Sequence, residues 1–388
     1  LNAIPSEHWR LSAQMGFSSW QRFKLLELPA IWSVLPGIGA LIMMMCFTSF
    51  AIIMTLGGGP KATTLEVAIY QALSFEYNIA KAVTLAGIQI LICAAFAFLM
   101  IKSNRHLKSD LSFSHSGEDD PHIIHLLTQS STKKITLGKI GNLLCILFVL
   151  LVMLPPLIAL IVRGISGLDL AILMKPAFLQ SLLTSLMISL SAGLISICLA
   201  IGLCMGLRRI KDKLITGAIE TLGSVILVFS PFALATGLFL FLYQHFSLGQ
   251  IGPYVVVGVN ALMALPIAIR VLAPAFRQSF EQTDLLCQSL NISGFNRLIR
   301  VDLPLLRAPV GLAFAYAATF SLGDFGIIAL FGSESFSTLP LYIYRAMGAY
   351  EMGEAAFASL ILLIVCYCLF NGIERLIGGS SRIQKDMK

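Results

Sequence analysis

Long apolar runs alternate with short polar segments along almost the whole of this 388-residue chain. A helix needs roughly 20 apolar residues to cross the roughly 30 Å hydrocarbon core of a bilayer, and eight runs approach that length. They lack the strict alternation of membrane barrel strands, so we expect them to be helical. The pattern predicts an all-α polytopic membrane protein with about eight spans, near residues 30–54, 80–101, 140–162, 182–207, 215–243, 253–274, 309–332 and 355–376.

The composition and the distribution of charge agree with a membrane location. Hydrophobic residues make up 57% of the chain and charged residues 12%, and the mean hydropathy is +0.85, which is far too apolar for a soluble domain. Of the 27 Lys and Arg residues, 22 lie in or beside alternate loops. Because basic residues favour the cytoplasmic side, they predict the topology and not a nucleic-acid site. The segments expected in the cytoplasm are 1–29, 102–139, 208–214, 275–308 and the tail after 376.

Two of these polar segments are copies of each other. Residues 5–29 and residues 283–304 are similar, and at an offset of 275 a large apolar residue, an Arg, an acid and a Leu-Pro pair stand in register. The match continues into the following spans, and after a one-residue slip it reaches Tyr70 and Tyr344. Such a long repeat predicts two homologous halves. The matched pairs include Trp20 and Phe295, Arg22 and Arg297, Glu27 and Asp302, Leu28 and Leu303, Pro29 and Pro304, Phe50 and Phe325, and Gly57 and Gly332.

The repeat also predicts the division of the chain. We expect residues 1–101 to be the C-terminal part of a first membrane domain, 102–139 a cytoplasmic linker, 140–376 a second domain of six spans, and 377–388 a cytoplasmic tail. Four spans precede the second copy of the loop within its half, whereas none precedes the first. We therefore expect a truncated first half that lacks about four helices. In the linker, His122 and His125 have no third ligand nearby, so no metal site is expected.

The repeated loop carries no catalytic pattern. It has no nucleophile paired with a base, and the chain has no phosphate-binding G-x-x-x-x-G-K-[ST] motif, so we expect no enzymatic activity. The loop instead offers a short amphipathic helix, a turn, and a Leu-Pro pair that suits the first turn of the next span. One copy alone could equally lie at the lipid headgroups, anchored by Trp and Arg side chains. Two copies in register favour docking to a protein partner that is itself two-fold.

The two loops resemble the cytoplasmic coupling loop of permeases from ABC importers. That pattern is Glu-Ala-Ala, three residues, Gly, nine residues, an aliphatic residue, one residue, and Leu-Pro. The first copy departs from it at Arg10-Leu11-Ser12, and the second at Leu285-Leu286-Cys287 and at Asn291 in place of Gly. Asn tolerates the left-handed conformation, so we expect the turn to persist. The resemblance implies that the ATPase is contacted through Gly16, Trp20, Arg22, Leu28 and Pro29, and through Asn291, Phe295, Arg297, Leu303 and Pro304.

Two further stretches, 49–73 and 320–350, are most similar to the fused double permeases for thiamine or thiamine pyrophosphate. Permeases for ferric iron and polyamines share part of this pattern and remain alternatives. The resemblance implies a type I importer fold in the bacterial inner membrane, with both termini of the chain cytoplasmic. It also implies a homodimer of separate ATPase subunits that uses ATP, a periplasmic binding protein that delivers a small-molecule substrate, and no cofactor bound by this chain.

Two other classes of protein are compatible with an apolar repeat. An ion-coupled secondary transporter also uses repeats, but acids within the spans are scarce here and the two halves have a parallel arrangement. A membrane scaffold would not require two loops in register. Dependence of uptake on ATP distinguishes an importer from an ion-coupled secondary transporter. Loss of uptake when the gene is deleted distinguishes an importer from a scaffold.

An acid lies inside a predicted span at Asp324, and its counterpart in the first half is Ser49. Ionisable side chains at membrane depth usually face a cavity or a partner. Asp324 could therefore line the substrate pathway and favour a cation such as thiamine. Alternatively, it caps a helix break beside Gly323 and Gly326, or pairs with a basic residue in the absent helices.

Overall fold

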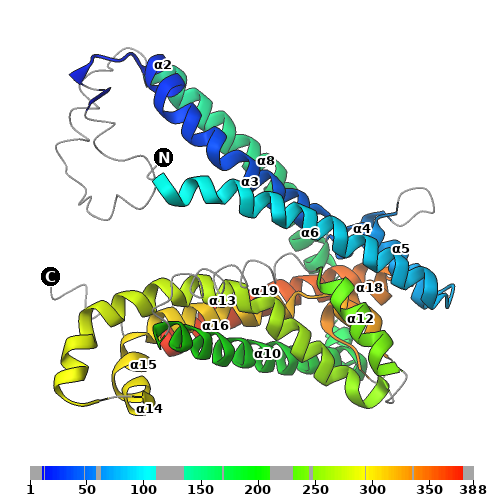
Figure 1. Ribbon diagram of the computed structural model, residues 1–388. Coiled ribbons are helices and arrows are strands. Elements are labelled where there is room, and N and C mark those ends of the chain that lie inside the picture. The colour runs from blue at the N-terminus through cyan, green and yellow to red at the C-terminus, as the bar shows by residue number, and fades with distance from the viewer. Residues whose placement is uncertain are drawn as a thin grey trace. The chain divides into compact units, whose positions relative to one another are not determined.

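The structure is a computed structural model that describes most of the chain. The described residues are 11–12, 14–47, 49–57, 63–110, 135–167, 170–209, 230–243, 248–292, 294–333 and 336–378. They form helices joined by short turns (Figure 1), which confirms the all-α prediction. Most of the predicted linker, the tail, His122, His125 and part of the predicted run 215–243 lie outside these residues.

The helices alternate between long spans and short connecting pieces. The long ones are α3 (Leu28–Phe47), α6 (Ile79–Asp110), α8 (Ile135–Ser166), α10 (Pro176–Arg209), α13 (Leu248–Ser289), α16 (Arg307–Leu322) and α19 (Met352–Gly378). The shorter ones are α2 (Ser19–Arg22), α4 (Phe50–Leu56), α5 (Leu65–Ser74), α9 (Leu170–Met174), α12 (Pro231–Tyr243), α14 (Gly294–Arg297), α15 (Leu303–Leu305), α17 (Gly326–Phe331) and α18 (Leu339–Gly348). Two π-helices complete the set, η1 (Phe23–Glu27) and η3 (Leu298–Asp302).

The chain divides into two compact units, which we describe separately. The first comprises Leu1–Phe47 and Ile92–Ala159, and the second comprises Thr48–Leu91 and Leu160–Lys388. The first unit contains the first copy of the repeated loop, in α2, η1 and the start of α3. The second unit contains the second copy of the loop. It also contains α4 and α5 of the first half and their counterparts in the second half, α17 and α18.

In the second unit, α10, α13, α16 and α19 pack against one another (Figure 1). Small side chains let the helices approach closely, as is usual between membrane helices. A Cβ atom added at Gly193 of α10 would lie 2.8 Å from Cε2 of Phe314 on α16. Ala200, Ala268 and Ala313 are fully buried in a cluster to which α10, α13 and α16 contribute.

Five described helices are long and apolar enough to cross a membrane, and a bent pair adds a sixth if it is counted as one span. They fall on six of the eight predicted runs. Run 30–54 contains α3 and α4, and the described end of run 215–243 is α12. The chain is thus a multi-pass membrane protein. The candidate spans are Ile79–Phe96, Leu143–Ser166, Pro176–Gly206, Ile251–Ser289 and Met352–Ile377, with the pair Leu298–Leu305 and Arg307–Leu322.

Two predicted boundaries were wrong. The run 309–332 is not one continuous helix, because α16 ends at Leu322 and α17 begins only at Gly326. The run 253–274 belongs to a 42-residue helix that continues to Ser289. Hydropathy marks where apolar residues stop, whereas a helix continues through polar residues that bond along its own backbone.

The repeat predicted from the sequence reappears in the order of the helices. At the offset of 275, α2, η1 and the start of α3 correspond residue for residue to α14, η3 and the start of α15. At the offset of 274, α5 corresponds to α18. Two stretches of the chain with limited sequence identity therefore form the same succession of short helices.

Candidate functional site

Each copy of the loop contains a tight turn with a residue in the left-handed conformation before its short helices. The residue is Gly16 in the first copy, with φ of 64°, and Asn291 in the second, with φ of 52°. The next residue closes the turn in both copies. Phe17 N–H donates to the carbonyl of Ser12 at 3.1 Å, and Ile292 N–H donates to that of Cys287 at 2.9 Å. These are the bonds of a helix C-terminus with an αL residue, so the prediction that Asn291 replaces Gly in this turn is confirmed.

The Leu-Pro pair begins a helix in both copies, but the helices differ. Leu28 and Pro29 begin α3, which runs for 20 residues. Leu303 and Pro304 begin α15, which has three residues, and the chain bends by 73° before α16. In the second copy the predicted entry to the next span was therefore wrong, and Arg307 begins that helix.

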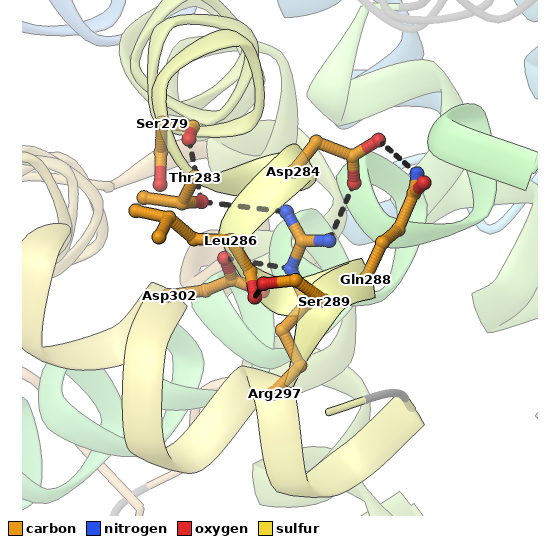
Figure 2. Close-up of polar contacts among 8 residues, drawn as sticks. All are labelled: Ser279, Thr283, Asp284, Leu286, Gln288, Ser289, Arg297 and Asp302. Atoms are coloured by element: carbon orange, nitrogen blue, oxygen red, sulfur yellow. Dashed lines mark hydrogen bonds and ion pairs between the residues drawn. The ribbon is translucent and has the colours of Figure 1, made fainter. Parts of the chain in front are cut away.

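The second loop is held to the end of α13 by a buried arginine. Arg297 is only 1% exposed. Its Nη1 donates to Oδ1 of Asp284 at 2.6 Å, and its Nη2 donates to Oγ1 of Thr283 at 3.4 Å. On the other side, its Nε lies 3.6 Å from Oδ1 of Asp302, which is equally buried. Figure 2 shows the guanidinium between these three side chains.

The contacts of Arg297 cross from one element to another. Thr283 and Asp284 belong to α13, whereas Asp302 ends η3. The guanidinium carbon also lies 5.2 Å from the centre of the Phe280 ring, within the range of a cation–π interaction. Because a buried charge is costly unless it is paired, the arginine fixes α14 and η3 against α13.

Its counterpart in the first copy has different surroundings. Arg22 is partly exposed, and its Nε donates to the backbone carbonyl of Phe17 at 3.0 Å. At the offset of 275, the position of Asp284 is taken by Trp9, which cannot pair with a guanidinium as a carboxylate does. The repeat in the sequence aligns the two arginines. It does not reveal that Arg297 is buried and forms ion pairs between elements.

Apolar side chains project from both loops. Trp20 is 69% exposed and stacks on Phe23 with ring centroids 5.7 Å apart. In the second loop Leu285 and Leu290 are 81% and 67% exposed, and Leu286, Ile299, Leu303 and Leu305 are also exposed. Phe295 lies in α14, and its side chain is outside the described residues. Clustered exposed apolar residues mark a surface that contacts a partner or a membrane.

Asp324 lies in the break between α16 and α17. Its Oδ2 accepts a hydrogen bond of 3.3 Å from the backbone N–H of Ile327, so it caps the start of α17. The side chain is partly buried, as is that of Ser49, which precedes α4 without a side-chain capping bond. The helix-cap alternative thus describes the observed contact, and a role of either residue toward a substrate stays a prediction.

The sequence analysis missed a second acid, Glu66. It lies in α5, outside the membrane-spanning helices, and is 1% exposed. Its Oε1 accepts hydrogen bonds from Nε2 of Gln89 at 2.9 Å and from Oγ of Ser230. Burial raises the pKa of Glu66 to about 7, although the bonds from Ser230 and Gln89 act in the opposite direction. The sequence does contain a signal that could have revealed Glu66. At the offset of 274 its counterpart in the second half is Pro340, so Glu66 is an acid that the repeat does not share.

Comparison with known proteins finds relatives over nearly the whole chain, although no family model matches it. It is 39% identical over 381 residues to the thiamine transport system permease protein ThiP of Escherichia coli (strain K12), covering 97% of this chain and 69% of that protein. The ThiP protein of Salmonella typhimurium is 38% identical over the same shares. That of Haemophilus influenzae is 34% identical over 379 residues, covering 96% of this chain and 68% of the relative.

Proposed function

Because the chain belongs to the family of thiamine transport system permease proteins, we propose that it is the membrane-spanning subunit of an ATP-driven importer that moves thiamine or its phosphate esters across the bacterial inner membrane. A periplasmic binding protein delivers the substrate. A homodimer of separate ATPase subunits binds and hydrolyses ATP, and this chain binds no cofactor of its own. Both copies of the loop, and both termini, face the cytoplasm.

The observation that carries the proposal is the repeated loop. Two copies have the same turn, the same succession of α-, π- and α-helix, and the same Leu-Pro pair. A two-fold ATPase needs one docking element on each half of the membrane protein, because rocking of the halves then opens the pathway to one side at a time. The domain division predicted from the sequence, with residues 140–376 as one half, belongs to this proposal.

The structure of the second loop suits the transmission of force. The exposed side chains of Leu285, Leu286 and Leu290 offer an apolar contact surface. Arg297, at the end of α14, ties the rest of the loop to α13 through Asp284. A displacement of the loop would therefore move α13, which extends for 42 residues. The names of the relatives favour thiamine over ferric iron and polyamines as the substrate.

The test uses the full-length protein reconstituted in vesicles with its ATPase and binding protein. We expect uptake of labelled thiamine to require ATP. Leu290→Ser should weaken association of the ATPase with the permease about tenfold, because burial of a leucine side chain contributes roughly 1.5–3 kcal/mol and a tenfold change corresponds to about 1.4 kcal/mol. Leu376→Ser changes an even more exposed leucine near the end of α19 and should leave association unchanged. Uptake that is indifferent to ATP, or uptake of iron in place of thiamine, contradicts the proposal.

A further inference from the structure

Aromatic residues related by the repeat meet in the core of the second unit. Phe50 and Phe325, which match at the offset of 275, stack with ring centroids 5.6 Å apart. Each also contacts a tyrosine of its own half. Tyr70 lies 5.6 Å from Phe50, and Tyr344 lies 5.0 Å from Phe325. Because the two tyrosines also match in the repeat, equivalent faces of the two halves meet here, and such repeat interfaces hold the substrate in many transporters.

A fifth ring joins these four from a segment that precedes the second copy of the loop. Phe232, near the start of α12, stacks on Phe50 at 4.6 Å and lies 6.5 Å from Tyr70. Phe50, Phe232 and Phe325 are all buried. The rings therefore pack on one another, and a ligand can enter only if they separate.

Two carboxyl groups border these rings. Around the Cβ position of Gly326, Cδ1 of Phe50 lies at 3.8 Å, and Oδ1 of Asp324 and Cδ2 of Phe232 both lie at 3.9 Å. Glu66 lies one helical turn before Tyr70 on α5, and Ser230, which hydrogen-bonds to it, lies two residues before Phe232. When both are ionised, the carboxylates of Glu66 and Asp324 repel each other.

The charge of these carboxyl groups is not balanced by the parts of the chain that the structure describes. There, Oε2 of Glu66 has no hydrogen-bond partner, and no basic side chain forms an ion pair with Glu66 or Asp324. Buried carboxylates are costly unless a positive charge accompanies them. Aromatic faces also attract cations, most strongly when water is excluded. Carboxylates beside stacked rings are the surroundings that suit a flat organic cation.

We propose that Glu66 and Asp324, with Phe50, Tyr70, Phe232, Phe325 and Tyr344, form the site that holds the substrate cation on its way through the membrane. We call these seven residues the aromatic–carboxylate cluster. The rings separate to admit the ligand and stack on its aromatic part, while its positive charge lies against the carboxylates. The inference rests on the proposed function. It specifies the residues at which the transporter selects a positively charged substrate.

The repeat supports this assignment, because both acids break it. The counterparts of Asp324 and Glu66 are Ser49 and Pro340, which carry no charge. A purely structural Glu66 would only join α5 to α6 and to the residue before α12 through its two hydrogen bonds. A structural role predicts an equal effect on charged and neutral substrates, whereas a binding role predicts an effect on the charged substrate alone.

The experiment therefore measures discrimination by charge in the reconstituted full-length complex. Labelled thiamine competes with unlabelled thiamine or with a neutral analogue in which thiophene replaces the thiazolium ring. We expect the wild-type complex to prefer thiamine at least tenfold. Glu66→Gln keeps both hydrogen bonds possible and should lower this preference about tenfold. Glu76→Gln, which changes an exposed glutamate paired with Lys81, should not alter it.

Phe50→Leu provides a second measurement should Glu66→Gln fail to assemble with the ATPase. It removes one aromatic face while keeping an apolar side chain, so the preference for the cation should again fall. Unchanged discrimination in every variant that assembles overturns the inference. Absence of ATP-dependent thiamine uptake in the wild-type complex overturns the proposed function instead. A failure of the proposed function is therefore seen in the wild-type complex, and a failure of this inference is seen only in the variants.

Discussion

At the scale of the residue, two arginines at equivalent positions of the repeat have different surroundings. Arg22 and Arg297 occupy the same place in the repeat, yet one is partly exposed and the other is enclosed by Asp284, Asp302 and Thr283. In the sequence, Trp9 stands at the position of the first copy that corresponds to Asp284 in the second. The second loop is thus fixed by charge, and the first is fixed by backbone hydrogen bonds.

Arg297→Met should therefore loosen the second loop. It removes the cation that pairs with the buried carboxylate of Asp302, and removing one member of a buried pair costs about 3 kcal/mol or more. We expect hydrogen exchange of the backbone amides in residues 294–305 to accelerate about 100-fold, since each tenfold step corresponds to about 1.4 kcal/mol.

The matched control is Arg22→Met in the first copy. Its guanidinium is partly exposed and donates to one carbonyl, so the amides of residues 19–30 should accelerate less than tenfold. Equal acceleration in the two loops would show that the ion pairs of Arg297 contribute nothing to the stability of its loop.

At the scale of the element, glycines mark where short helices press on their neighbours. Gly332 ends α17, and a Cβ atom there would lie 2.4 Å from Cδ2 of Leu341 on α18 and 2.6 Å from the carbonyl oxygen of Ile328. Its counterpart Gly57 ends α4, where the added atom would lie 2.9 Å from the carbonyl oxygen of Ile53. The two halves share this contact because the short helix ends at the same place in both.

Gly332→Ala should lower the thermal midpoint of the purified complex. The added methyl group meets backbone that cannot rotate away, and overpacking of this kind costs about 1–3 kcal/mol. Gly372→Ala in α19 is the control, because its Cβ would meet nothing within 4 Å and alanine favours a helix. A midpoint unchanged by Gly332→Ala would contradict the close approach of α17 to α18.

The elements also show what the sequence could predict. Apolar length predicted most of the spans, and the resemblance of the loop to a known pattern predicted the left-handed turn at Asn291, since both depend on local order along the chain. The extension of α13 to Ser289 was missed because hydropathy falls where the membrane ends. The burial of Glu66 and Arg297 was missed because it depends on Gln89, Ser230 and Asp284, which come close only after folding.

At the scale of the whole molecule, the orientation in the membrane follows from the distribution of Lys and Arg. The turn that contains Tyr77, between α5 and α6, is predicted outside, and the second loop is predicted inside. Both offer well-exposed positions, since Tyr77 is 83% and Leu285 is 81% exposed. They are therefore suitable sites for probing each side with a reagent that cannot cross the membrane.

In a variant without native cysteines, Tyr77→Cys should react with an impermeant maleimide in cells whose outer membrane alone is permeable. Leu285→Cys should react only after the inner membrane is opened, because positive loops remain in the cytoplasm. Labelling of Leu285→Cys in cells with an intact inner membrane would reverse the topology and separate the loops from any cytoplasmic ATPase.

The π-helices η1 and η3 have a consequence for the history of the chain. A π turn contains one more residue than an α turn, so each loop carries an inserted residue within its helix. The insertion stands at the same register in both copies, from Phe23 to Glu27 and from Leu298 to Asp302. Two independent insertions would have to coincide in place and in length. A single insertion that preceded a duplication of one half accounts for both π-helices at once.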